Sequence, residues 1–254
     1  MAQGHPFFMA HYGILGAGWL MQKWILNRPK DQFTITTRTG ISPIPAQAIV
    51  KTIPFQINEH SLNKEDWEGV KCIICSIPFS GRTPKEENEV KAKALVKQLQ
   101  QLNKPIIFLS STGVYSPEPN TYTEESQSLT ESIQIAEQII QQLDAPVTIL
   151  RLGGLMGAER YLSKYIQTGN TQVVNHIHYE DAFRAIEHIA EKQLWNTIFN
   201  VVAPEHPSQQ QVISYQLHQE LIDKEEIESP RIIDGSKLQR EAFTFTHPNP
   251  IYFK

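Results

Sequence analysis

The chain has 254 residues, of which 40% are hydrophobic, and its 23 basic side chains nearly balance 27 acidic ones. This length can bury one large core without a disulfide or a metal, and the small net charge excludes a basic surface for nucleic acid or anionic membranes. No apolar run approaches the ~20 residues of a membrane span, and two cysteines are too few for a disulfide-built secreted domain, so we expect a cytoplasmic protein.

Residues 1–9 lack the basic stretch of a signal peptide, and Met9 could be the natural start. From there to about residue 203, short apolar runs alternate with amphipathic segments of helical length. The predicted strands are 11–15, 33–38, 49–57 with a break at Pro54, 70–76, 105–110, 147–152 and 197–202. The predicted helices are 19–26, 84–102, 128–143 and 179–192. Ser128 and Glu131 have the spacing of a capping box. Strands that alternate with helices indicate an α/β fold with a doubly wound parallel sheet.

The pattern changes after Pro204. We predict a helix from 208 to about 221 and a strand at 231–233, followed by a proline-rich end. The chain therefore divides into a sheet domain and a small C-terminal lobe. The sheet domain takes residues 9–155 plus 180–203, and the lobe takes residues 156–179 plus 204–254.

The first predicted strand runs into two glycines, Gly16 and Gly18, and then into a helix that starts at Trp19 and Leu20. Gly16 permits a tight turn, and Gly18 lets a pyrophosphate approach the N–H groups at the helix N-terminus. Met21 replaces the third glycine of the usual fingerprint. This strand–turn–helix context predicts a dinucleotide site in a Rossmann fold, against the alternative of an ordinary tight turn.

The end of the second predicted strand indicates which dinucleotide binds. An NAD site typically has an acidic residue there, which binds the ribose 2′-hydroxyl. This strand instead ends in Thr37, Arg38 and Thr39, and Asp31 lies at its opposite end. Because the planar guanidinium suits a 2′-phosphate, we predict NADP rather than NAD. The alternative is a solvated arginine at a strand end.

The fifth predicted strand ends in a run of hydroxyl side chains, Ser110, Ser111 and Thr112, followed by Tyr115. Ligands of doubly wound sheets bind beyond the carboxyl ends of the strands. These hydroxyls could therefore face a nicotinamide and a substrate oxygen. Alternatively, they only hydrogen-bond the backbone at the strand end.

Together with later segments, these motifs resemble the extended short-chain dehydrogenase/reductase superfamily, in its NAD-dependent epimerase/dehydratase group. The later segments are 151–157 with Arg160, 174–178 before Asp181, 199–202 and 243–250. The resemblance covers nearly the whole chain from Met9.

The resemblance implies roles for particular residues. Ser111 would occupy the catalytic serine or threonine position, four residues before the motif tyrosine Tyr115. The residues implied to lie along the cofactor are Ser76, Ile77 and Pro78 towards the adenosine ribose and pyrophosphate, and Ser110, Leu152, Gly153 and Gly154 towards the nicotinamide. The residues expected around the substrate are Thr112, Arg160, Asn175, His176 and His178.

The sequence departs from the family at the proton relay. Active members carry a Tyr-x-x-x-Lys pair on the helix after the fifth strand, in which the lysine lowers the pKa of the tyrosine. Counting back from Glu137, the two positions fall on Leu129 and Ile133, which cannot move a proton. A substitute would have to come from elsewhere, and Tyr115, Tyr122 or water are the candidates. Glu124 and Glu125, in the same loop as Tyr122, could also act as an acid or base, but we rather expect a solvated charged loop there.

Two other patterns have competing interpretations. Cys72 and Cys75 lie on a predicted strand whose period of two turns them to opposite faces, so we predict buried structural cysteines rather than a redox pair. His176 and His178 share one face of their segment and could bind a metal. We instead expect them to form a wall of the substrate pocket, and we expect no metal site.

These observations lead to two hypotheses. In the first, the protein is an oxidoreductase or epimerase-like enzyme that binds NADP in the sheet domain and a small polar substrate in the C-terminal lobe. In the second, it is a non-catalytic NADP-binding sensor or partner-binding protein that has lost the relay. A homodimer through the long helices would be usual for the family, and we expect no nucleic-acid or membrane partner.

Overall fold

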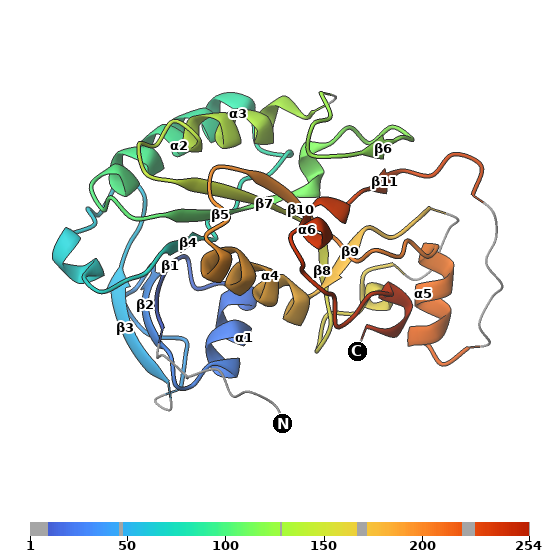
Figure 1. The fold of residues 1–254 in the computed structure, drawn as a ribbon, viewed down its shortest axis with the longest axis horizontal. Coiled ribbons are helices and arrows are strands. Elements are labelled where there is room, and N and C mark those ends of the chain that lie inside the picture. Colours follow the sequence, from blue (N-terminus) through green and yellow to red (C-terminus); the bar gives the residue numbers. More distant parts are fainter. Residues whose placement is uncertain (1–9, 46–47, 128, 167–171, 220–226, 254) are drawn as a thin grey trace.

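The computed structural model describes residues 10–45, 48–127, 129–166, 172–219 and 227–253. Its centre is a seven-stranded parallel sheet in the order β10-β7-β5-β4-β1-β2-β3 (Figure 1). The strands are β1 (His11–Leu15), β2 (Gln32–Thr37), β3 (Ile49–Pro54), β4 (Ile73–Cys75), β5 (Ile106–Ser111), β7 (Val147–Leu152) and β10 (Ile198–Val201). The strand order reverses between β1 and β4, so the topological switch point lies between their carboxyl ends.

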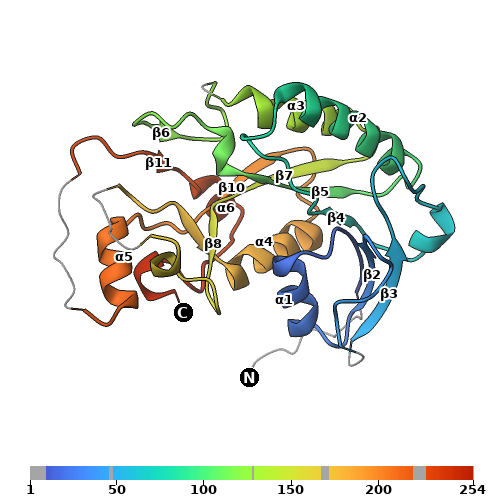
Figure 2. The same ribbon diagram turned by 180° about the vertical axis from the view of Figure 1, so that it is seen from behind.

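Helices cover both faces of this sheet, as Figures 1 and 2 show. One face carries α1 (Trp19–Asn27) and α4 (Tyr179–Lys192), and the other carries α2 (Lys85–Gln100) and α3 (Glu131–Ile140). Each helix pair buries its apolar stripe in a separate core, because a sheet flanked on both sides presents apolar side chains in both directions. The predicted doubly wound α/β fold is confirmed.

The other elements are short. Two-stranded sheets join β6 (Thr121–Tyr122) to β11 (Ile232–Ile233) and β8 (Gly154–Met156) to β9 (His176–His178). The remaining helices are α5 (Gln209–Gln216), α6 (Ser236–Arg240) and the 3-10 helices η1 (Lys64–Trp67), η2 (Thr112–Val114), η3 (Leu162–Lys164) and η4 (Pro250–Tyr252). The sequence did not predict β6, β8, β9 and α6, because two to five residues are too few to establish a period. The division into two domains stays a prediction.

Several predicted boundaries are wrong. Strand β3 ends at Pro54, where the sequence indicated a break, and does not resume towards residue 57. Helix α5 stops at Gln216, because His218 adopts a left-handed conformation with φ of 56°. Helix α3 begins after Thr130, so Leu129 precedes the helix and pairs with Tyr115 in an antiparallel bridge.

Some predictions fall on residues that the structure does not describe. These are Met9, the capping residue Ser128 and the predicted helix end near residue 221. Among the described residues, no helix combines the length and the apolar character that crossing a bilayer requires.

Cys72 and Cys75 are free and buried, and they belong to the cores on opposite faces of the sheet, as predicted. Burial raises the pKa of each thiol to about 12. Because the two thiols are buried on opposite faces of the sheet, this arrangement argues against a redox pair.

Candidate functional site

A cavity of about 670 Å³ lies at the switch point, against the turn between β1 and α1. Gly16 has a φ of 90°, and its N–H donates to Thr36 Oγ1 at 2.9 Å, which fixes the turn to β2. A Cβ on Gly18 would meet no atom within 4 Å, so the turn is open on that side. Gly18 is also the N-cap of α1, and the first turn of this helix has no acidic residue. The free N–H groups of this helix end can therefore hold an anion.

Most of the predicted cofactor residues line this cavity. They are Gly16, Gly18, Thr37, Arg38, Thr39, Ser76, Ile77 and Pro78. Ser76 donates to the carbonyl oxygen of Gly16 and so ties the end of β4 to the turn. Trp19 and Leu20 do not line the cavity: Leu20 is in the core and Trp19 contacts Tyr179. Trp19 and Leu20 could therefore contact a cofactor only through their backbone N–H groups.

Two cations border the cavity, and the sequence analysis identified only one of them. Arg38 is exposed at the end of β2. Lys91, on α2, points its Nζ at the Pro78 carbonyl oxygen at 2.5 Å and lies over the Phe79 ring at 4.6 Å. Burial, with a smaller contribution from the Arg38 charge, lowers the pKa of Lys91. No described carboxylate pairs with either cation, so both charges are available to a phosphate.

A second cavity, of about 900 Å³, lies between the end of β5, strands β8 and β9, and segment 227–231. The predicted substrate residues Thr112, Asn175 and His176 line it. Sequence analysis missed Arg231, which also lines it and donates to the carbonyl oxygens of Ser116 and Thr112 at 2.8 and 3.1 Å. Burial lowers the pKa of Arg231, and no described carboxylate pairs with it. Its positive charge can therefore attract an anion.

His176 is the second polar group of this cavity. Its ring packs so closely on Gly154 that a Cβ there would come within 2.5 Å of it. Burial lowers the pKa of His176 to about 4, so the ring is neutral at neutral pH. Its Nδ1 is buried without a hydrogen-bond partner among the described residues. A neutral imidazole in this state can hydrogen-bond a substrate oxygen that enters the cavity.

Asn175 acts differently from His176. Its amide donates to the Arg231 carbonyl oxygen and accepts from the Ile233 N–H, both at 2.8 Å. The side chain therefore holds the segment around β11 in place. This use of both amide groups makes Asn175 a positioning residue for Arg231.

The two tyrosines predicted as proton donors lie in the interior. The Tyr115 hydroxyl donates to Asn200 Oδ1 at 2.7 Å and accepts from Arg151 at 2.8 Å, and burial raises its pKa. The Tyr122 hydroxyl donates to the Glu118 carbonyl oxygen at 3.0 Å. Both side chains are almost fully buried. This burial argues against proton transfer to a substrate from either hydroxyl.

The two serines at the end of β5 have different partners. Ser110 donates to Glu137 Oε1 at 2.5 Å, so its proton is not directed at a cofactor. Ser111 accepts from the Gly113 N–H at 3.1 Å and keeps its own proton for another acceptor. Ile133, at the expected lysine position, packs in an apolar cluster with Tyr115, with Leu129 against it.

The segment after β7 reaches the substrate cavity only at Gly154. Leu152 lies in the core. Gly153 is pressed against the Asn175 carbonyl oxygen, which a Cβ would approach to 2.5 Å. Neither residue lines the described cavities, so their predicted contact with a nicotinamide stays a prediction.

Two predicted substrate residues lie outside the substrate cavity. His178 is 3% exposed and caps α4, where its Nδ1 accepts from the Glu180 N–H at 3.4 Å. The Arg160 guanidinium stacks on the Trp19 ring at 4.0 Å. The chain reverses at Gly157, with φ of 106°, and this turn carries Arg160 to the start of α1. Neither residue lines the second cavity, so their predicted contact with a substrate stays a prediction.

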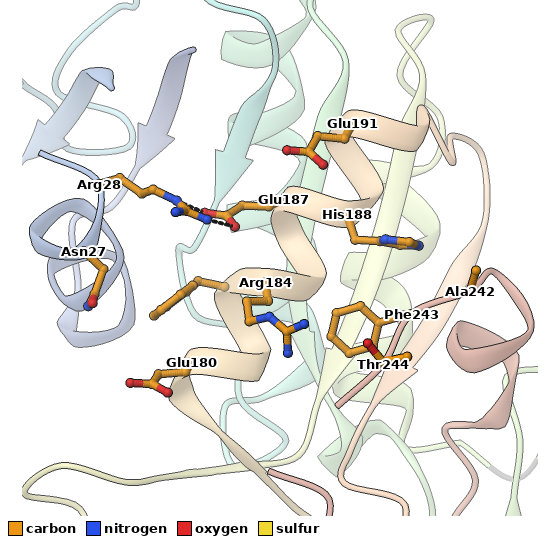
Figure 3. Close-up of a pocket in the computed structure, with 11 residues that line it drawn as sticks. Asn27, Arg28, Glu180, Arg184, Glu187, His188, Glu191, Ala242, Phe243 and Thr244 are labelled. Atoms are coloured by element: carbon orange, nitrogen blue, oxygen red, sulfur yellow. Dashed lines mark hydrogen bonds and ion pairs between the residues drawn. The ribbon is translucent and has the colours of Figure 1, made fainter. Parts of the chain in front are cut away.

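A third depression, of about 440 Å³, lies over α4 and contains none of the predicted site residues (Figure 3). Arg28 reaches across it from the end of α1 and pairs with Glu187. Arg184 pairs with Asp181 at 2.6 Å and lies over the Phe243 ring. Because its arginines already have carboxylate partners, we assign no function to this depression.

The chain matches no protein-family model and no curated protein sequence, but it shares its fold with solved structures. The structure of MoeE5 in complex with UDP-glucose and NAD is 16% identical, with a TM-score of 0.72 and 93% of each chain covered. UDP-glucuronic acid 4-epimerase from Bacillus cereus, in complex with NAD, is 14% identical, with a TM-score of 0.71 over 93% of this chain and 94% of that one. The human epimerase family protein SDR39U1 (isoform 2), with NADPH, is 11% identical, with a TM-score of 0.70 over 94% and 96%. These likenesses confirm the fold that the resemblance implied.

Proposed function

We propose that this protein is an NADP-dependent oxidoreductase or epimerase-like enzyme of the extended short-chain dehydrogenase/reductase type that acts on a small, polar, anionic substrate. One observation carries the proposal. In a single cavity, the glycine turn and the open helix end of α1 face Arg38 and Lys91, two cations that pair with no carboxylate in the described part of the chain. A dinucleotide with an additional phosphate complements this combination of groups.

The residues of the cavity fit NADP. Gly18 leaves room for the diphosphate beside the N–H groups of α1, and Arg38 and Lys91 would hold the 2′-phosphate. Strand β2 ends at Thr37 and is followed by Arg38, not by the acidic residue that binds a free 2′-hydroxyl. The NADPH in the structure of human SDR39U1 is consistent with this choice. When bound, the nicotinamide would supply hydride transfer.

The substrate cavity supports an anionic substrate, such as a sugar that carries a phosphate or a nucleotide. Arg231 would pair with the anion, and the neutral His176 would hydrogen-bond a hydroxyl or carbonyl oxygen. Ser111 does not line the cavity itself but directly precedes Thr112, which does, and it would reach the same oxygen from the end of β5. UDP-glucose in the MoeE5 structure is a ligand of this chemical class. A substrate-sized cavity beside Gly154 favours an enzyme over a non-catalytic sensor.

The test is a calorimetric titration of the NADPH-saturated protein with UDP-glucose and with glucose. We expect UDP-glucose to bind and glucose not to bind, because glucose lacks the anion. Arg231→Gln should lower the affinity for UDP-glucose by at least about tenfold. Arg240→Gln is the matched control, since Arg240 hydrogen-bonds Ser236 on the exposed surface of α6. Equal affinity in the wild type and in Arg231→Gln would contradict the anionic substrate.

A further inference from the structure

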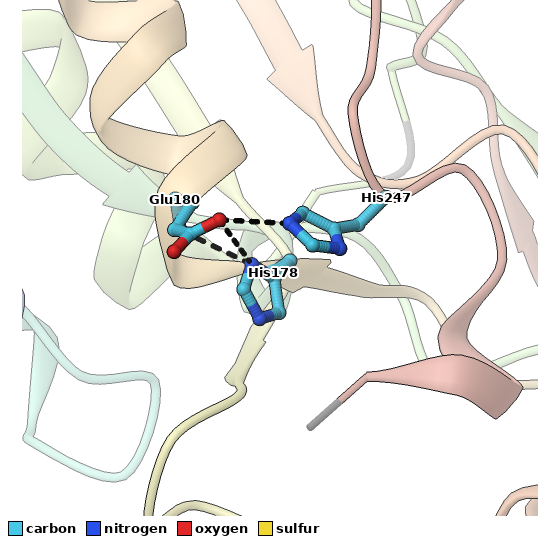
Figure 4. Close-up of side chains that lie close together, drawn as sticks. All are labelled: His178, Glu180 and His247. Atoms are coloured by element: carbon cyan, nitrogen blue, oxygen red, sulfur yellow. Dashed lines mark hydrogen bonds and ion pairs between the residues drawn. The ribbon is translucent and has the colours of Figure 1, made fainter.

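Two histidines and a carboxylate converge where the C-terminal segment crosses the start of α4 (Figure 4). One ligand atom from each of His178, Glu180 and His247 lies within 4.8 Å of the others. Glu180 Oε2 is 2.8 Å from His247 Nε2 and 3.8 Å from His178 Nδ1. The two imidazole rings are tilted by 36° to each other, with centroids 3.7 Å apart, and one nitrogen of each ring faces the same carboxylate oxygen.

We propose that His178, Glu180 and His247 bind one divalent transition-metal ion of the zinc class. Zinc takes imidazole nitrogen and carboxylate oxygen at about 2.0–2.2 Å, which places tetrahedral ligand atoms about 3.4 Å from each other. The observed separations of 2.8 and 3.8 Å lie on either side of that value. The three ligand atoms all lie within 4.8 Å of one another, so side-chain adjustments can bring them to a common ion. The long 3.4 Å hydrogen bond from the Glu180 N–H to His178 Nδ1 would give way to the metal bond.

Neighbouring residues hold two of the ligands in place before any ion binds. Asp181 is fully buried and accepts from the backbone N–H groups of Thr246 and His247 at 2.9 and 2.7 Å. His247 is thereby fixed beside α4 through its main chain. Hydrogen-bonded partners that orient ligands in this way are typical of protein metal sites.

The carboxylate is oriented as well. The Tyr179 hydroxyl donates to Glu180 Oε1 at 3.2 Å, which directs Oε2 towards the histidines. The carboxylate oxygen Oε2 is thereby placed to serve as a metal ligand.

The three ligands also leave one side open. The His178 side chain is 3% exposed, whereas those of His247 and Glu180 are 29% and 37% exposed. An ion would thus be held by protein on one side and could take a water molecule on the other. A set of two imidazoles and one carboxylate favours zinc, cobalt or nickel over calcium or magnesium.

The competing explanation is a hydrogen-bonded cluster that only secures the C-terminal segment. Asp181 already secures that segment through two backbone hydrogen bonds, independently of the three proposed ligands. The two explanations differ in one measurable property, which is stoichiometric metal binding.

The experiment is a titration of the chelator-treated, nucleotide-free protein with Zn²⁺ by calorimetry and with Co²⁺ by visible absorption. We expect one ion per chain, with a zinc Kd of about micromolar or tighter at neutral pH. Glu180→Gln and His247→Ala should each weaken binding at least about tenfold and abolish the visible cobalt bands. His188→Ala is the control, because His188 lies on the same helix and bonds the Glu241 carbonyl oxygen instead.

Thermal unfolding without metal shows whether each variant folds. If His247→Ala does not fold, Glu180→Gln, which keeps the shape of the side chain, decides the test. Zinc should raise the melting temperature of the wild type and of His188→Ala only. Affinity should fall as the pH is lowered, because the histidines must be neutral to bind. Absence of stoichiometric binding in the wild type, or equal affinity in Glu180→Gln, would overturn the proposal. Neither result depends on NADP binding.

Discussion

Glu137 and Arg151 form a buried ion pair, with nitrogen–oxygen distances of 2.6 to 3.2 Å and side chains that are 2% and 3% exposed. The same carboxylate accepts from Ser110, and the same guanidinium donates to the Tyr115 hydroxyl. The pair thus joins α3 to the ends of β5 and β7. Those ends lead directly to Thr112 and Gly154 in the wall of the substrate cavity.

Removing one partner of this pair should destabilise the fold strongly. Glu137→Gln leaves the buried guanidinium without a counter-charge, which typically costs about 3–5 kcal/mol. We expect a loss of that size in the free energy of unfolding measured with urea. Glu89→Gln, in an exposed pair with Lys93, should change it little. Equal stabilities of the two variants would contradict the structural role of the buried pair.

Arg38→Asp should lower the affinity for NADPH far more than the affinity for NADH. The arginine would bind the 2′-phosphate, which NADH lacks, and a charged hydrogen bond contributes about 1.5–3 kcal/mol. We therefore expect the NADPH affinity to fall at least about tenfold while the NADH affinity changes little. Calorimetric titration of the variant with both nucleotides measures this difference. Equal losses for NADPH and NADH would remove the 2′-phosphate role.

Lys91 should make the preference for NADPH sensitive to alkaline pH. Burial lowers the pKa of its ammonium group, so its charge is lost at a lower pH than that of an ordinary lysine. The ratio of NADPH to NADH affinity should therefore fall as the pH rises through that lowered pKa. In Lys91→Gln the ratio should be smaller and independent of this titration. Lys93→Gln, on the same helix but paired with Glu89, should behave like the wild type.

His176 should destabilise the protein in acid. Its folded-state pKa of about 4 lies below the ordinary 6.5, so below pH 6.5 the unfolded chain binds a proton that the folded protein excludes. Its contribution is constant above pH 6.5 and declines towards pH 4, by at most about 1.4 kcal/mol per pH unit. His176→Asn should lack this component in urea unfolding curves measured across that range. Parallel pH dependence in both proteins would show that the ring is not buried in its neutral form.

The sequence predicts well those strands, helices and turns that residues close together in the chain determine. Strands β1 and β7 and helix α4 have the boundaries that the alternation of apolar and polar residues indicated. The glycine turn was recognised because strand, turn and helix are contiguous in the chain. Arg38 followed from the same logic, since the end of β2 lies beside that turn in every sheet of this order.

The features that depend on distant contacts were missed. Lys91 is one polar residue among many on an amphipathic helix, and only the packing of α2 beside β4 brings it to the cavity. Arg231 enters the site through a two-residue strand pairing that no periodicity reveals. The internal hydrogen bonds of Tyr115 and Tyr122 could not be foreseen either, because the sequence does not show which hydroxyls the interior uses as hydrogen-bond donors.

The most direct test of the account is a calorimetric titration of the purified wild-type protein with NADPH, NADP, NADH and NAD. The account predicts that NADPH and NADP bind with Kd values of about micromolar strength, at least about tenfold tighter than NADH and NAD. Such a result would support the glycine turn, Arg38 and Lys91 as one NADP site. Binding of none of the four nucleotides, or equal affinity for the two pairs, would contradict it.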